Sequence, residues 1–185
     1  MGVAHNPQEA VIETRQLYKR FGQVTALENI NIRIQRGEFV AIMGASGSGK
    51  TTLMNILTCL DTLTEGQVLL DGVDAAALDE EGRRRFRADK IGLVFQQFHL
   101  IPFLTALENV MLVQVGLEHR TDHLPSQLSE ENEQRVLALL QDLHHQGRTI
   151  VMVTHNPELG RFADRIIRLQ HGKYLSEEVQ QHAVA

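Results

Sequence analysis

The octapeptide GASGSGKT occupies residues 44–51 and has the spacing of a Walker A phosphate-binding loop. It follows a strand-like run at residues 38–43, and a helical pattern begins directly after the loop at Thr51. A Gly/Ser-rich surface turn that ends by chance in Gly-Lys-Thr would seldom have a strand directly before it and a helix directly after it. The stretch therefore predicts a P-loop between a strand and a helix.

The residue types in this loop suit the binding of nucleotide phosphates. Glycines let the backbone curl so that its N–H groups converge on phosphate oxygens, and the following helix turns the positive end of its dipole toward them. Lys50 would neutralise the β- and γ-phosphates, and Thr51 would bind Mg²⁺. We expect the nucleotide to contact Gly44, Ser46, Gly47, Ser48, Gly49, Lys50, Thr51 and Thr52.

Length and composition predict one ordinary globular domain. The chain has 185 residues, of which 43% are hydrophobic and 22% charged, and this is enough for one well-buried core. Its formal net charge of -5 argues against a protein that coats nucleic acid, because neutralising phosphates needs a surplus of Lys and Arg. The single cysteine, Cys59, excludes an internal disulfide framework and fits a reducing cytosol. Since no apolar run approaches the roughly 20 residues that span a bilayer, and residues 1–10 lack signal-peptide features, any membrane-crossing part would belong to another chain.

The rest of the pattern predicts an α/β fold. A run at 149–154 is typical of a strand buried on both faces of a parallel sheet, and residues 165–175 predict a hairpin that turns at His171-Gly172. Further strands are expected at 11–17, 30–34, 66–73 and 91–95.

Helices are predicted by apolar residues at spacings of three and four. One helical face comprises Leu53, Ile56, Leu57 and Leu60, and a second comprises Val136, Leu139, Leu140 and Leu143, with Gly147 as its terminator. Residues 79–89 predict a solvated helix with Phe86 packed inward, and a further helix is expected at about 105–113.

The order of these segments resembles the ATP-binding subunits of ABC transporters, most closely those of lipoprotein-release and macrolide-export systems. The resemblance implies a P-loop NTPase fold of this type, with a mostly parallel core sheet flanked by helices and an antiparallel β subdomain, and it implies ATP as the nucleotide. It extends over nearly the whole chain and rests on Ala26–Ile30, Gly37–Met43, Leu60–Asp61, Thr64–Gly66, Ile91–Phe98, Leu100–Pro102, Leu107–Val110 and Val153–His155.

The resemblance gives three residues outside the loop a role. Gln96 matches the Q-loop glutamine, which senses Mg²⁺ and the γ-phosphate, and His155 matches the switch histidine, which contacts the γ-phosphate. Both are candidate catalytic residues, and Gln96 joins Thr51 as a candidate metal ligand. Phe21 matches the aromatic residue that stacks on adenine, with a core phenylalanine as the alternative. The apolar loop at 98–104 matches the neighbourhood that receives a coupling helix from a transmembrane permease, with burial in the chain's own core as the alternative.

The chain departs from the family pattern where the signature motif is expected. After Ser129 the family continues with two glycines, whereas Glu-Glu-Asn-Glu follows here, and no apolar run that ends in the Asp-Glu of a Walker B motif is present. A segment is apparently missing between residues 129 and 130, and a shorter one between 114 and 115, where most of the helical subdomain would lie. Either both are absent from the polypeptide, or they are disordered and the printed residues are only its ordered part. Because losing two functional blocks while keeping the rest is unusual, the second reading is favoured.

The resemblance implies two functions that depend on these segments. With them, the chain is the energy-coupling ATPase of an exporter or lipoprotein-release complex, pairing head to tail as a homodimer around ATP and held by its permease at the cytoplasmic side of the inner membrane. Without them, no Walker B aspartate supports Mg²⁺ and no glutamate polarises water, so the chain binds ATP without hydrolysing it. A soluble ABC-type ATPase that acts on nucleic acid or ribosomes is a further alternative, which the acidic composition disfavours.

Overall fold

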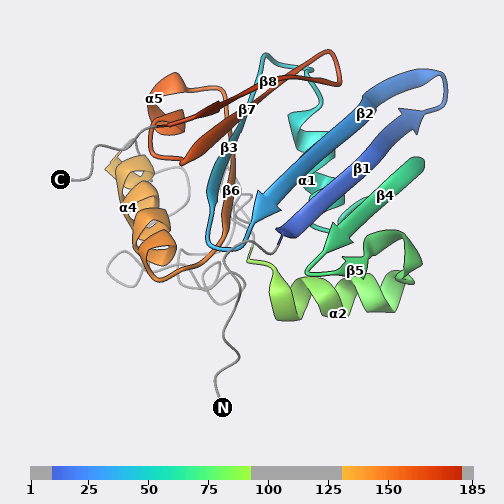
Figure 1. The fold of residues 1–185 in the computed structure, drawn as a ribbon, viewed down its shortest axis with the longest axis horizontal. Coiled ribbons are helices and arrows are strands. Elements are labelled where there is room, and N and C mark those ends of the chain that lie inside the picture. The colour runs from blue at the N-terminus through green and yellow to red at the C-terminus, as the bar shows by residue number, and fades with distance from the viewer. Residues whose placement is uncertain (1–9, 93–130, 181–185) are drawn as a thin grey trace, which may run out of the picture.

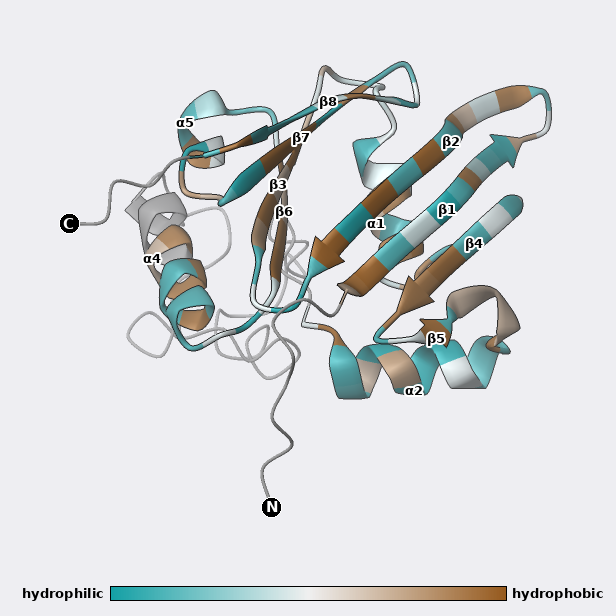
Figure 2. Cartoon of the chain, viewed as in Figure 1, coloured by the Kyte–Doolittle hydropathy of each residue, from teal (hydrophilic) through white to brown (hydrophobic). Residues whose placement is uncertain are grey.

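The computed structural model of the chain describes residues 10–92 and 131–180, where eight strands form two four-stranded sheets (Figure 1). The first sheet is antiparallel throughout, and Figure 2 shows hydrophobic and hydrophilic residues alternating along its strand β2. One of its faces is therefore apolar and packs against the core. Its strands lie in the order β2 (Val24–Gln35), β1 (Ala10–Phe21), β4 (Glu65–Leu70) and β5 (Val73–Asp74).

The second sheet is the predicted parallel core. Its central strand β3 (Phe39–Met43) runs parallel to β6 (Ile150–Thr154) on one side and to β7 (Arg165–Gln170) on the other. Strand β8 (Lys173–Val179) closes the order β6-β3-β7-β8 as an antiparallel partner of β7. The predicted combination of a mostly parallel sheet with an antiparallel β subdomain is thus confirmed.

Strand β3 is buried on both faces because a different apolar cluster covers each of them. Val40 and Ile42 belong to the larger cluster, which also contains residues of the first sheet and of helix α1 (Lys50–Leu57). Phe39, Ala41 and Met43 belong to a second cluster, against which Leu140 of helix α4 (Glu131–His145) packs. The strand that leads into the P-loop is consequently held rigidly from both sides.

Helix α1 ends earlier than its apolar pattern predicts. Cys59 adopts a left-handed conformation with φ of 56°, its N–H donates to Ile56 O at 3.0 Å, and Leu60 N–H donates to Asn55 O at 2.7 Å. This pair of bonds is the Schellman arrangement that terminates a helix. It turns Leu60 away from the core, so this residue is 46% exposed and the prediction that Leu60 extends the buried face is wrong.

Strand β6 is also less buried than its sequence predicts. Residues 150–153 are only half-buried, although Thr154 is buried. Among the described residues β6 pairs with β3 alone, so it lies at the edge of the described part of the sheet. A sequence that is apolar on both sides of a strand is typical of a central strand in a sheet. The pattern does not show, however, how many neighbouring strands pair with it.

Two short elements and one charged helix complete the described chain. The 3₁₀ turn η1 (Ala75–Ala77) and helix α5 (Pro157–Gly160) are short, whereas α2 (Glu80–Lys90) is the predicted solvated helix. Phe86 packs against the larger core cluster, as predicted, and the side chain of Asp79 caps the helix by accepting from Gly82 N–H at 2.7 Å. Of the helices in these two ranges, none is long and apolar enough to cross a membrane.

Asp71, in the turn between β4 and β5, ties three parts of the chain together. Its carboxylate accepts from Arg36 and, at 3.1 Å, from Lys90 Nζ at the end of α2. The guanidinium of Arg36, and secondly the ammonium of Lys90, hold the pKa of Asp71 below its ordinary value of 3.8. Each of its two carboxylate oxygens thus accepts from a basic side chain of another segment.

Replacing Asp71 by asparagine should lower the free energy of unfolding at neutral pH by about 1 kcal/mol or less, because these charges are partly solvated. A lowered pKa in the folded state means that the contribution is complete above pH 3.8 and is lost as the pH falls through the lower folded-state value. Urea unfolding of the original chain and of Asp71→Asn measures the difference in their free energies of unfolding. This difference should be smaller at the lowest pH where both proteins fold than at pH 7. An equal difference at both pH values would refute the ion-pair explanation.

Several predictions lie outside the described residues. They include the strand at 91–95 beyond residue 92, the apolar loop at 98–104, the helix at 105–113 and the two junctions at 114/115 and 129/130.

Candidate nucleotide-binding site

The P-loop connects the buried end of β3 to the first residue of α1. Gly49 occupies the N-cap position with φ of 95° and has no side chain to accept hydrogen bonds from the first turn of α1. A Cβ atom at this position would lie 2.8 Å from Ala26 O and 2.8 Å from Leu27 Cδ2, so only glycine fits. The N–H groups at the start of α1 are therefore not capped by a side chain, which is the arrangement that binds anions at a helix N-terminus.

Lys50 folds back over the loop that precedes it. Its Nζ donates to Gly44 O at 2.9 Å, to Ala45 O at 2.8 Å and to Ser48 Oγ at 3.4 Å. Ser48 is buried within the loop, and its own N–H donates to Ala45 O at 3.1 Å. These bonds place the ammonium group in the concave side of the loop, beside the helix terminus, where phosphate oxygens would be bound.

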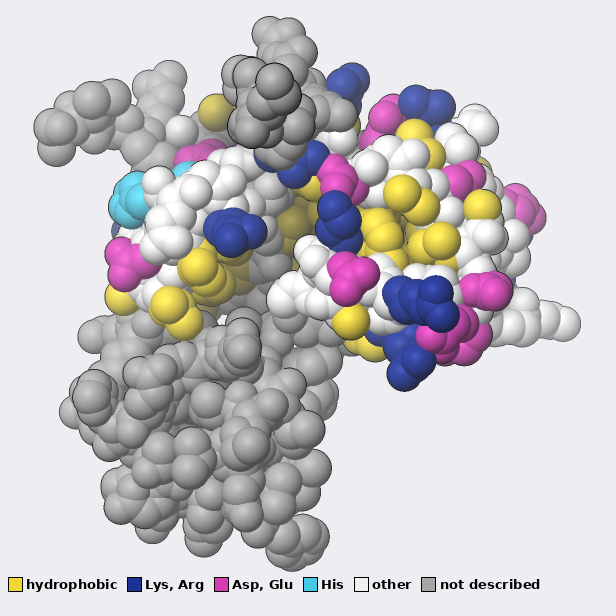
Figure 3. Space-filling model, turned by 90° about the horizontal axis from the view of Figure 1, so that it is seen from below, with side chains coloured by type: hydrophobic (Ala, Val, Ile, Leu, Met, Phe, Trp, Pro, Cys, Tyr) yellow, Lys and Arg dark blue, Asp and Glu magenta, His cyan; other side chains and the backbone are white. Residues whose placement is uncertain are grey.

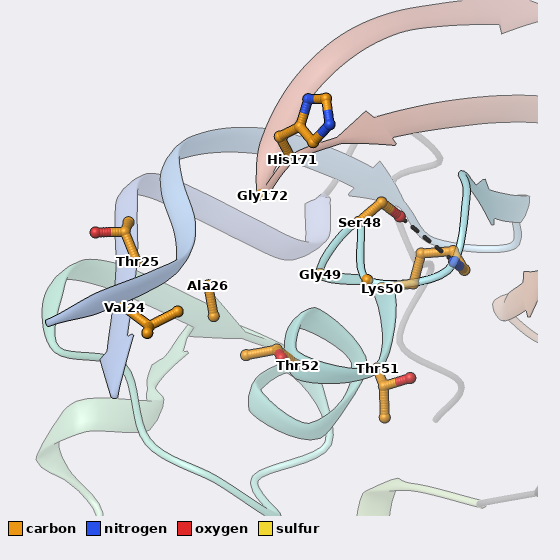
Figure 4. A pocket seen from close by; sticks show the side chains of 11 residues that line it. Val24, Thr25, Ala26, Ser48, Gly49, Lys50, Thr51, Thr52, His171 and Gly172 are labelled. Atoms are coloured by element: carbon orange, nitrogen blue, oxygen red, sulfur yellow. Dashed lines mark hydrogen bonds between the residues drawn. The ribbon is translucent and has the colours of Figure 1, made fainter. Parts of the chain in front are cut away.

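A cavity of about 380 Å³ opens beside the loop (Figure 4). This volume is in the range of small-molecule sites. Residues from three parts of the chain line it: the start of β2, the P-loop with the first turn of α1, and the turn between β7 and β8. The lining residues are Val24, Thr25, Ala26, Gly47, Ser48, Gly49, Lys50, Thr51, Thr52, His171 and Gly172, and none of them is acidic.

Most of the predicted loop residues line this cavity, but not all of them. The part of the motif from Gly47 to Thr52 does so, with the Thr51 side chain exposed. Ser46 is exposed and, like Gly44, belongs to the loop without lining the cavity. The contacts of these two residues with a nucleotide stay predictions.

His155 lies at the same edge of the parallel sheet as the P-loop. Strands β3 and β6 are in register with Met43 opposite Thr154, so Gly44 and His155 are the next residues of neighbouring strands. The histidine is exposed and does not line the cavity described above. Its position is suitable for a residue that approaches the far end of a bound polyphosphate, and its switch role stays a prediction.

Phe21 ends β1 at the hairpin that leads into the cavity wall. It pairs with Val24, which lines the cavity, but Phe21 itself does not. The residue is 53% exposed, so the alternative of a core phenylalanine is wrong. Lys19 Nζ lies over the ring, 4.7 Å from its centroid, and the role of Phe21 in stacking on adenine stays a prediction.

Gln96 lies outside the described residues, so the structure does not place this predicted metal and catalytic residue. Within the described part of the chain, no group of three or more His, Cys, Asp or Glu side chains could hold a metal ion. Sequence reasoning missed Val24, Thr25 and the His171-Gly172 turn as parts of the cavity. The turn itself was predicted, but a turn signal does not reveal what the turn contacts.

Comparison with known proteins decides the family. The chain matches the family described as ABC transporter over residues 27–182, which is most of its length. The chain belongs to the ABC transporter family. The resemblance in segment order is thereby confirmed, and the strand, P-loop and helix described above are those of an ABC-type ATP-binding cassette.

The ABC transporter relatives include long and short proteins. The chain is 35% identical over 223 residues to the macrolide export ATP-binding/permease protein MacB of Shewanella sp. (strain W3-18-1), a match that covers 91% of this chain and 34% of MacB. It is 38% identical over 210 residues to the ABC transporter ATP-binding protein MJ0796 of Methanocaldococcus jannaschii, covering 84% of this chain and 89% of that protein. The chain thus spans about a third of the length of its MacB relatives.

Solved ABC cassettes share the fold. The dimeric structure of MJ0796, described as a bacterial ABC transporter cassette, superimposes with a TM-score of 0.82 at 34% identity and covers 93% of this chain and 100% of that one. A second dimeric structure of the same protein, in a post-hydrolysis state bound to ADP and Pi, gives a TM-score of 0.81. The predicted P-loop NTPase fold of the ABC type is confirmed, and the family as a whole binds and hydrolyses ATP.

Proposed function

We propose that this chain is the ATP-binding, energy-coupling subunit of an ABC transporter of the exporter or lipoprotein-release type. The observation that carries the proposal is the P-loop cavity, where a helix N-terminus without a side-chain cap, the Lys50 ammonium and the Thr51 hydroxyl converge. Backbone N–H donors and one ammonium suit a polyphosphate, and a hydroxyl beside them suits the Mg²⁺ that accompanies it. Bound Mg²⁺ would neutralise charge on the phosphates.

The chain's own residues divide the work of binding. The N–H groups from Gly47 to Thr51 would bind phosphate oxygens, and Lys50 would exchange its bonds to Gly44 O and Ala45 O for bonds to the β- and γ-phosphates. Val24 and Thr25 on the opposite wall, with Phe21 beside them, would contact the base and ribose.

For the chain as printed, we propose binding without hydrolysis. No acidic residue lines the cavity among those described, and neither a Walker B motif nor a signature motif occurs in the 185 residues. The match to MacB runs over 223 residues, which is longer than the chain itself, so the relative carries residues inside the matched region that this chain lacks. This supports missing internal segments, at 129/130 and 114/115 by our reading.

The partners that we propose are a transmembrane permease and a second copy of the chain, at the cytoplasmic side of a membrane. Two observations support them: MacB is named as an ATP-binding and permease protein, and the MJ0796 cassettes are dimeric. A nucleic-acid partner is disfavoured because three of the four arginines of α2 pair with acids of the same helix, Arg83 with Glu80 and both Arg84 and Arg85 with Glu81. On the face shown in Figure 3, basic and acidic side chains likewise lie side by side.

Calorimetric titration of the purified chain with MgATP, followed by a phosphate-release assay on the same sample, tests both parts of this proposal. For a polypeptide of 20.8 kDa, we expect saturable binding and no phosphate release above the rate in the absence of protein. An absence of binding would refute the proposed function, whereas binding with sustained turnover would refute only the proposed lack of hydrolysis. Intact mass spectrometry of that sample shows whether the polypeptide has the 20.8 kDa of the printed sequence or contains additional internal segments.

A further inference from the structure

Three backbone segments meet at the wall of the P-loop cavity. They are the start of β2, the loop itself and the turn between β7 and β8. Gly172 N–H in that turn donates to Ser48 O at 3.1 Å, and Gly172 O accepts from Glu28 N–H at 2.7 Å. One residue near the C-terminal end of the described chain thereby hydrogen-bonds both to the phosphate loop and to the other sheet.

The contact at Gly172 leaves no room for a larger residue. A Cβ atom at Gly172 would lie 2.5 Å from Ala26 O and 3.0 Å from Ala26 C, which are backbone atoms that cannot rotate away. The same Ala26 carbonyl lies close to Gly49. A Cβ atom added at Gly49 would lie 3.4 Å from Gly172 Cα. Any atom added at Gly172 must therefore push the turn away from β2, and the bond from Gly172 N–H to Ser48 O connects that displacement to the P-loop.

We propose that Gly172 is a positioning residue for the nucleotide site, and that its backbone contacts fix where the P-loop lies relative to β2. The inference rests on the proposed function, because it assumes that the cavity binds a nucleotide. Figure 4 shows the turn beside Ser48 and Gly49 at one wall of the cavity, with β2 at another. A change at the turn alters the spacing of these walls although Gly172 contributes no side chain.

The chain contains a matched control for this proposal in the turn between β4 and β5. There Asp71 and Gly72 have φ of 50° and 78°, close to the 48° and 75° of His171 and Gly172. A Cβ atom at Gly72 would meet nothing within 4 Å, however. Alanine at either glycine brings the same left-handed strain, so the two variants differ in whether the added atom meets Ala26.

The experiment compares Gly172→Ala with Gly72→Ala in the complete chain, measuring melting temperature and the dissociation constant for MgATP. Both variants should melt at lower temperature than the original chain, because both glycines have positive φ. Only Gly172→Ala should weaken MgATP binding, by about tenfold or more, since a misplacement of about 1 Å in a site can cost about a hundredfold. Equal affinities for the two variants would overturn the proposal.

A second pair keeps the test decisive if Gly172→Ala does not fold. Asparagine tolerates the left-handed region but still carries a Cβ, so Gly172→Asn retains the contact with Ala26 and relieves most of the backbone strain. We expect Gly172→Asn to lose affinity and Gly72→Asn to keep it, and the same affinity in both would again overturn the inference. If the original chain itself fails to bind MgATP, the proposed function is refuted.

Discussion

Replacing Lys50 by alanine should weaken MgATP binding roughly 30- to 150-fold, which corresponds to about 2–3 kcal/mol, a typical contribution of hydrogen bonds from a charged donor. Lys50 Nζ is held over the loop by the carbonyls of Gly44 and Ala45, so it lies where a polyphosphate would be bound. The loss should be smaller for AMP than for ATP, because the lysine is placed to contact the β- and γ-phosphates. Calorimetric titrations with the two nucleotides measure both effects.

Lys90→Ala is the control for this charge change. Lys90 is exposed and pairs with Asp71 at the end of α2, outside the cavity. Its removal changes the net charge of the chain by the same amount and should leave the MgATP affinity within about twofold, since exposed charges are largely screened beyond a Debye length. If Lys50→Ala binds MgATP as tightly as Lys90→Ala, the P-loop is not the phosphate site.

The second large effect is expected in the core beneath the P-loop. Phe39→Ala should lower the free energy of unfolding by about 3–5 kcal/mol, because it removes a large buried side chain and leaves a cavity. Phe39 is fully buried in the cluster on the second face of β3, and its ring meets that of His144 edge-on with centroids 5.7 Å apart. Urea unfolding of this variant and of the original chain measures the difference.

The same substitution at an exposed phenylalanine shows how much of the loss in unfolding free energy is due to burial and how much to the residue type. Phe162 is 39% exposed, so Phe162→Ala should lower the free energy of unfolding by about 1 kcal/mol or less. Similar losses at both positions would mean that β3 is not the centre of a packed core. The description of β3 as covered by an apolar cluster on each face would then be wrong as well.

Features set by local chemistry were predictable from the sequence. The P-loop combines a motif with a strand and a helix on either side, and the hairpin at His171-Gly172 has a specific turn signal, so both appear where they were predicted. The end of α4 near Gly147 was equally readable, because glycine adopts the left-handed conformation there with φ of 81°.

Features that depend on contacts between distant segments were not predictable. Leu60 continues an apolar helical pattern, and only the Schellman bonds that end α1 reveal its exposure. The apolar strand β6 reads as central, yet β3 is its only partner among the described strands. The turn at Gly172 contacts Ser48, and these residues are more than a hundred positions apart in the sequence. Sequence periodicity indicates local secondary structure and does not predict such a distant contact.

The meeting of three backbones at Gly172 also determines where this chain tolerates insertions. A peptide tag or fluorescent reporter placed between β7 and β8 would have to pass the Ala26 carbonyl, whereas the turn at Gly72 opens into free space. Surface turns with open surroundings accept added residues most readily. A label that leaves the nucleotide site undisturbed is therefore best attached in the β4–β5 turn, directly after Gly72, so that Asp71 keeps its place in the chain.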